Sequence, residues 1–109
     1  MNEAFTRIES PFHCDLHSFT SEQRLVHADL TARLVAAILE KRELAEGFAF
    51  RLDAEKAPPD VIGQWIELER KCCPFFGFRL DVEPERGAIW LQLNGRVGVK
   101  DFIRAELKQ

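Results

Sequence analysis

Two adjacent cysteines carry the clearest chemical signal in the chain. Cys72 and Cys73 follow Glu69 by three and four residues, and Pro74 comes directly after them. Side chains three and four positions apart share one face of a helix, so the Glu69 carboxylate and both sulfurs can converge. Cysteine thiolates bind soft or borderline metal ions such as zinc or mercury. The pattern predicts a thiol metal site, with Glu69 as an extra ligand or as a hydrogen-bond partner of a ligand.

Glu69 lies on the apolar side of a helix predicted from about Asp60 to Cys72 or Cys73. The apolar side also holds Val61, Ile62, Trp65, Ile66 and Leu68. An ionised carboxylate left unpaired in a core would cost several kcal/mol, so Glu69 must be paired, bound or protonated. The structural alternative to a metal role is a buried salt bridge, for which the candidate partners are Arg51, Arg79 and His27.

The N-terminal segment offers further metal donors in the sequence His13-Cys14-Asp15-Leu16-His17. Cys14 would be a third sulfur ligand, and His13 or His17 would complete the four ligands of a structural zinc site. If the thiols share zinc, the Cys14 sulfur should lie about 3.5–4 Å from those of Cys72 and Cys73. The alternative is that both histidines are surface side chains and that the cysteines only fill the core.

A nucleophilic role for Cys72 and Cys73 is disfavoured by their place at a helix C-terminus. The partial negative charge there opposes a thiolate, and Glu69 acts in the same direction. A metal ion would supply the missing positive charge. An enzyme that uses Glu69 as a general acid or base with Cys73 is therefore the weaker hypothesis, and enzymatic activity is left open.

The elements that must position these groups are read from hydrophobic periodicity and from helix-capping and turn residues. They are a helix over 21–42 that begins after the capping box Thr20–Gln23, a strand over 47–52, a helix over 60–73, strands over 76–82 and 89–93 joined by a turn over 84–87, and a helix over 99–108. The order α-β-α-β-β-α predicts an α+β fold with a mostly antiparallel three-stranded sheet packed on helices. A short strand over 12–16 would add a fourth, N-terminal strand. Residues 1–19 are expected to be an irregular segment, and residues 20–109 a single domain.

Length and charge limit the classes of function. The chain has 109 residues, enough for one domain, and a net charge of −3, which disfavours nucleic-acid binding. No apolar run approaches the roughly 18–20 residues that span a bilayer, and the N-terminus lacks a signal-peptide pattern. We therefore expect a cytoplasmic protein with reduced cysteines and with neither nucleic acid nor membrane as a partner.

The first predicted helix has apolar side chains on two sides. One side holds Leu25, Ala28, Ala32, Val35 and Leu39, and the other holds Leu30, Leu34, Ala37 and Ile38. One of these sides can meet a second copy of the chain, or the N-terminal segment can fold over it. The alternative function is therefore a dimeric interaction or ligand-sensing module with purely structural cysteines.

The segment from Glu69 to Leu80, Glu-Arg-Lys-Cys-Cys-Pro-Phe-Phe-Gly-Phe-Arg-Leu, resembles the core of a family of small uncharacterised bacterial proteins. That family shares a Glu-x-x-Cys-Cys-Pro-Phe-Phe-x-Phe core, and the resemblance extends to residues 89–93, to residues 98–103 and to Cys14. Similar segments are fused to regulators of the mercury-resistance type. The resemblance implies heavy-metal or thiol chemistry at Cys14, Cys72 and Cys73.

Overall fold

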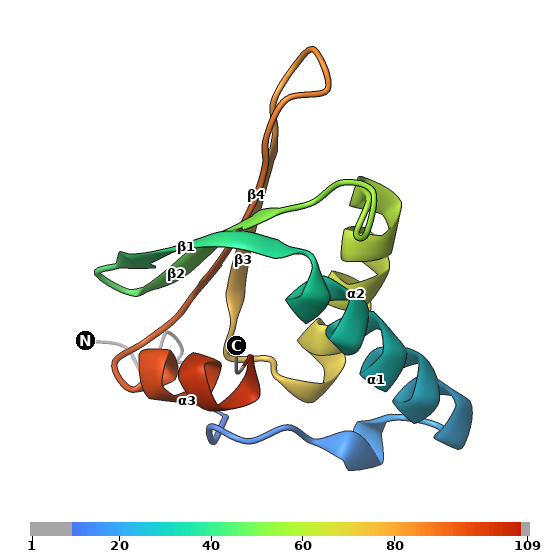
Figure 1. The fold of residues 1–109 in the computed structure, drawn as a ribbon. Coiled ribbons are helices and arrows are strands. Elements are labelled where there is room, and N and C mark those ends of the chain that lie inside the picture. The colour runs from blue at the N-terminus through green and yellow to red at the C-terminus, as the bar shows by residue number, and fades with distance from the viewer. Residues whose placement is uncertain (1–9, 108–109) are drawn as a thin grey trace, which may run out of the picture.

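The computed structural model describes residues 10–107, which form one antiparallel sheet with helices on one of its faces (Figure 1). The elements are η2 (Leu16–Ser18), α1 (Ser21–Ala36), β1 (Ile38–Leu44), β2 (Gly47–Leu52), α2 (Pro59–Cys72), β3 (Gly77–Val82), β4 (Ile89–Asn94) and α3 (Val99–Glu106). The strands lie in the order β1-β2-β4-β3, and each neighbouring pair is antiparallel. Residues 10–19 run along the helical side of the molecule.

The core lies between the central strands and the helices. Phe50 of β2 faces Leu91 of β4 across the sheet, and both side chains are buried. Burying one such side chain stabilises a fold by about 1.5–3 kcal/mol. Trp65 of α2 is also buried, and its indole N–H donates a hydrogen bond to Thr31 Oγ1 of α1 at 3.0 Å. This bond fixes α2, which carries the cysteine pair, against α1.

The structure is α+β, but the expected element order and the three-stranded sheet are wrong. The order is α-β-β-α-β-β-α, and the sheet has four strands in the described part of the chain. The additional strand is β1, whereas the strand expected over 12–16 is not formed. Helix α1 ends at Ala36, not at Arg42, because the chain turns there into β1.

The sequence analysis did not predict β1 because the residue types of this strand favour a helix. Its middle, Glu40–Glu43, consists of glutamate, lysine and arginine, which rank among the better helix formers. The structure instead pairs it with β2 through a two-residue connection, with Leu44 opposite Gly47. Pairing in the sheet overrides the local helix preference, and the charges suit an edge strand because they discourage pairing with other chains.

The ends of the elements nearest the site are as predicted. Thr20 and Gln23 form the reciprocal capping box at the start of α1, with bonds of 3.0 and 3.1 Å. Helix α2 ends at Cys72, because Pro74 restricts the backbone of the residue before it.

Among the helices of residues 10–107, none has the length and apolar character needed to cross a membrane.

The β3–β4 hairpin has a strained turn that predicts a stabilising double substitution. Glu85 and Arg86 have φ values of 62° and 55°, and the Gly87 N–H donates to the Pro84 carbonyl at 3.0 Å. Two positive φ angles define a type I′ turn, which favours Asn-Gly. Replacing Glu85→Asn and Arg86→Gly together should raise the free energy of unfolding by about 1 kcal/mol in urea titrations.

The matched control for this prediction is the exposed turn that contains Glu55 and Lys56. Neither residue is among the described residues with a positive φ. Glu55→Asn with Lys56→Gly should therefore not stabilise the protein. Equal gains from both double variants would show that turn strain is not the cause.

Candidate metal centre

Backbone hydrogen bonds bring the N-terminal segment to the end of α2. The Asp15 N–H donates to the Cys72 carbonyl at 2.8 Å, and the Ser18 hydroxyl donates to the Lys71 carbonyl at 3.5 Å. The last carbonyls of a helix have no partner within it, so these contacts satisfy groups that would otherwise need water. The same contacts place Cys14, one residue before Asp15, beside the cysteine pair.

The end of α2 turns both cysteines inward. The Cys73 N–H donates to the Glu69 carbonyl at 2.7 Å, and the Phe76 N–H donates to the Cys73 carbonyl at 3.2 Å. The side chains of Cys72 and Cys73 are fully buried, and Cys14 is half-buried. The inward direction of Cys72, Cys73 and Glu69 that the helical wheel predicted is therefore confirmed.

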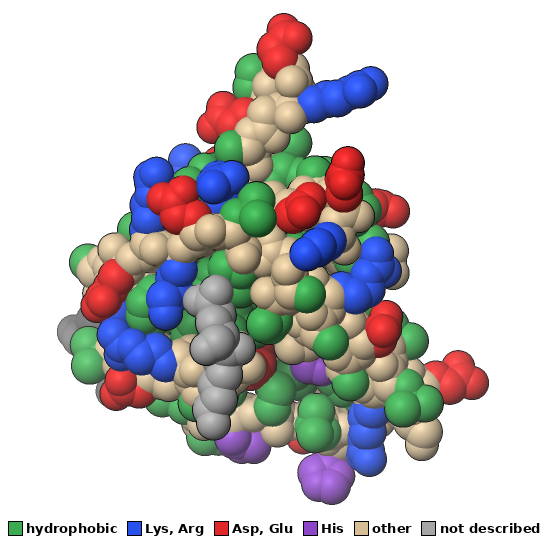
Figure 2. Space-filling view, in the orientation of Figure 1, with side chains coloured by type: hydrophobic (Ala, Val, Ile, Leu, Met, Phe, Trp, Pro, Cys, Tyr) green, Lys and Arg blue, Asp and Glu red, His purple; other side chains and the backbone are tan. Residues whose placement is uncertain are grey.

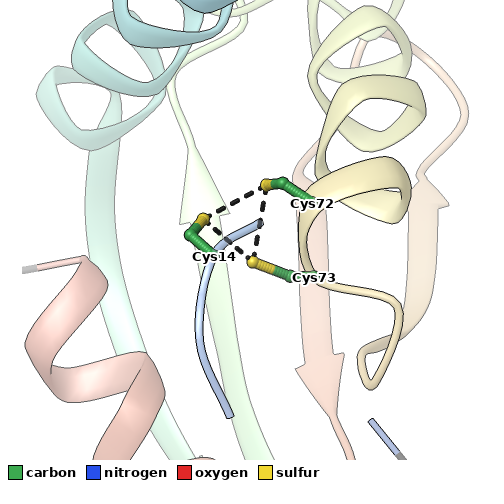
Figure 3. A group of neighbouring side chains, drawn as sticks. All are labelled: Cys14, Cys72 and Cys73. Atoms are coloured by element: carbon green, nitrogen blue, oxygen red, sulfur yellow. Dashed lines mark hydrogen bonds between the residues drawn. The ribbon is translucent and has the colours of Figure 1, made fainter. Parts of the chain in front are cut away.

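The three sulfur atoms form a compact triangle (Figure 3). Cys14 Sγ lies 3.2 Å from Cys72 Sγ and 3.1 Å from Cys73 Sγ, and the latter two are 3.5 Å apart. Sulfurs that share a tetrahedral zinc ion at about 2.3 Å lie about 3.8 Å from one another. The spacing in this structure is therefore a few tenths of an ångström tighter than the ligated arrangement, and no rearrangement of the fold is needed to reach it.

Glu69 is paired with His27 of α1, one of the three candidate partners. Glu69 Oε1 lies 2.7 Å from His27 Nε2, and the glutamate is fully buried. This hydrogen bond raises the pKa of the His27 imidazole, while burial acts in the opposite direction. The second oxygen, Glu69 Oε2, is buried without a hydrogen-bond partner in the described residues. A buried carboxylate oxygen of this kind is an acceptor for a proton or a cation.

Glu106 of α3 is a site residue that the sequence analysis missed. Its Oε1 lies 3.7 Å from Cys14 Sγ and 3.8 Å from Cys73 Sγ. Burial, followed by the nearby Glu69 carboxylate, raises the pKa of Glu106 to about 10. The helical wheel that singled out Glu69 applies here too, because Glu106 follows the inward-facing residues Phe102 and Ile103 by four and three positions.

The pKa values of the three thiols are shifted in different directions. Hydrogen bonds from Cys72 and Cys73 lower the pKa of the Cys14 thiol to about 3. The bonds with Cys14 raise the pKa of both other thiols above the usual value, and burial and the charge of Glu69 add to this. At neutral pH the cluster therefore holds one thiolate, on Cys14, and two thiols.

Three overlapping groups of side chains have donor atoms close enough to hold a metal ion. They are Cys14 with Cys72 and Cys73, His27 with Glu69 and Cys72, and Glu69 with Cys73 and Glu106, and within each group the donor atoms lie within 4.8 Å of one another. Sulfur, imidazole and carboxylate are the donors that zinc uses in proteins. The composition of the cluster and the unpartnered Glu69 oxygen therefore both fit a cation.

His13 and His17, the other sequence-predicted ligands, have exposed side chains. Neither belongs to the three groups of close donors found among residues 10–107. His17 lies in η2, where its backbone N–H donates to Asp15 Oδ1 at 3.2 Å. The structure thus brings together Cys14, Cys72, Cys73 and Glu69 and adds His27 and Glu106 around them.

Comparison of the chain with protein-family models, curated proteins and solved structures finds no match.

Proposed function

We propose that this protein binds a soft or borderline metal ion through Cys14, Cys72 and Cys73, and that its role is related to zinc or to heavy metals such as mercury. The observation that supports the proposal best is the triangle of sulfurs from two segments far apart in the sequence, 3.1–3.5 Å on a side, next to a buried carboxylate oxygen without a partner. Three thiols that only filled a core would not need such a carboxylate beside them.

The charges around the thiols favour a cation over a catalytic nucleophile. Glu69 and Glu106 surround the sulfurs with acidic groups, and the end of α2 adds partial negative charge. His27 Nε2 lies 4.0 Å from Cys72 Sγ, and the same nitrogen is hydrogen-bonded to Glu69. A divalent ion would supply the positive charge that allows Cys72 and Cys73 to ionise, and the carboxylates would balance the remaining charge.

Metal titration of the reduced protein tests this proposal. Native mass spectrometry with Zn²⁺, Hg²⁺ and arsenite should detect uptake of one equivalent per chain. Because the pKa values of the Cys72 and Cys73 thiols are raised in the free protein, zinc binding at pH 7 should release about two protons, and about three if Glu106 is the fourth ligand. Calorimetry in two buffers of different ionisation enthalpy measures this number. Zinc affinity should fall by roughly a hundredfold per unit decrease in pH if two protons compete with the ion, and by roughly a thousandfold if three do.

The double variant Cys72→Ser/Cys73→Ser is the control for specific uptake. It keeps Cys14 and both exposed histidines, and it should take up no stoichiometric ion. Absence of uptake by the wild type, or equal uptake by the double variant, would rule out the proposed site.

A further inference from the structure

An open groove runs along α1 and ends at the thiol cluster. Its volume is about 730 Å³. Its apolar lining includes Ala28, Ala32 and Val35, and its polar lining includes Cys14, Arg24 and Glu106. The molecular surface is hollowed between α1 and α3, with apolar side chains along the margin (Figure 2).

The groove and the thiol cluster share Cys14. Its sulfur faces Cys72 and Cys73 and also forms part of the groove wall. Ala28, Ala32 and Ala36 recur every four residues, so they follow one line along α1. Their small side chains leave room beside the helix, and the apolar wall leads to the Cys14 sulfur. A ligand that fits both the thiol cluster and the groove would combine a group that binds a thiolate with an apolar substituent.

We propose that the groove holds the organic substituent of a monoorganometal cation, such as an organomercury ion, whose metal is bound by Cys14. This inference rests on the proposed function and names its ligand class. In the binding step the Cys14 thiolate replaces a water molecule or a carrier thiolate on the metal: the mercury–sulfur bond to Cys14 forms, the bond from mercury to the departing ligand breaks, and a departing thiolate takes up a proton from solvent. A cation with one positive charge and one thiolate form a neutral complex, which an apolar wall accommodates better than a bare dication.

Competition with free cysteine isolates the contribution of the groove. The cation forms one mercury–sulfur bond both in the complex with free cysteine and in the complex with the protein. The two complexes therefore differ in the surroundings of the organic group. For the wild type, the exchange constant with free cysteine should favour phenylmercury over methylmercury by about tenfold, because a ring buries more apolar area than a methyl group. Native mass spectrometry measures the bound fraction for each cation.

Two substitutions on α1 serve as a matched pair. Ala32→Trp fills the groove and should remove the phenyl preference, while the uptake of inorganic Hg²⁺ stays unchanged. Asp29→Trp adds the same bulk at an exposed position outside the groove lining, and it should keep the preference. The ¹⁹F resonance of bound 4-fluorophenylmercury should also give a nuclear Overhauser contact to the methyl groups of Ala28 and Ala32.

The possible outcomes separate this inference from the proposed function. Equal retention of phenylmercury and methylmercury, or a missing contact to the alanine methyls, overturns the groove assignment even if Hg²⁺ still binds. Loss of Hg²⁺ binding as well overturns the metal site itself. A second copy of the chain is the competing occupant, because exposed Leu25 continues the same line of α1. In that case light scattering would find a dimer, and the phenyl preference would disappear as protein concentration rises.

Discussion

Replacing His27 with leucine should lower the free energy of unfolding by about 3–5 kcal/mol. The substitution removes the hydrogen bond with His27 and leaves the fully buried Glu69 carboxylate with the Cys72 thiol, a weak donor 3.8 Å from Oε1. A buried carboxylate that loses its strongest partner is among the most costly changes in a folded domain. Urea titration of the metal-free, reduced protein, followed by circular dichroism, measures this loss.

The double variant His27→Leu/Glu69→Leu tests the cause of the loss. It removes both members of the buried pair and keeps side chains of similar volume, so it should recover most of the stability that His27→Leu loses. If the double variant is as unstable as the single one, loss of packing by the imidazole, and not the stranded carboxylate, explains the effect.

Replacing Cys14 with serine should lower zinc affinity by about a hundredfold. Structural zinc sites contribute about 10–16 kcal/mol through four ligands, so one ligand accounts for roughly 3 kcal/mol, or about two orders of magnitude. The fold should persist, because Cys14 is only half-buried and the Asp15 N–H still bonds to Cys72. Competition with a chromophoric chelator measures the affinity.

The remaining ligand is identified by two further variants in the same assay. Glu106→Gln should weaken zinc binding by about tenfold, because it removes the carboxylate closest to Cys14 and Cys73. His13→Ala/His17→Ala should leave the affinity unchanged, because neither histidine is among the close groups of donors in the described residues. The opposite result would assign the ligand to the N-terminal histidines that the sequence suggested.

The helical positions of the site could be predicted because a helix is local. Cys72 lies three positions after Glu69, and the 3.6-residue period alone places both on the apolar side of α2. The end of α2 was predictable for the same reason, since Pro74 acts on its immediate neighbours. The pairing of Glu69 could only be narrowed to three partners, because it depends on how α1 packs against α2.

The features that could not be predicted depend on contacts between residues far apart in the sequence. β1 has a charged, helix-favouring composition, and only its partner β2 makes it a strand. The approach of Glu106 depends on where α3 packs, which its own residues do not determine. The sequence predicted Cys14 as the third sulfur, but not the main-chain hydrogen bond from Asp15 to Cys72 that places it, because every residue type has the same main-chain carbonyl. The expected dimer through the first helix stays a prediction.

The wide separation of Cys14 and Cys72 along the chain has a consequence for folding. An ion bound to both would join positions 58 residues apart and act as a removable cross-link. Closing a loop of that length restricts the denatured ensemble by about 4 kcal/mol in the chain-entropy description of covalent cross-links. Reducing agents would leave such a cross-link intact, whereas a chelator would remove it, so the protein would keep the rigidity of a disulfide under conditions that reduce disulfides.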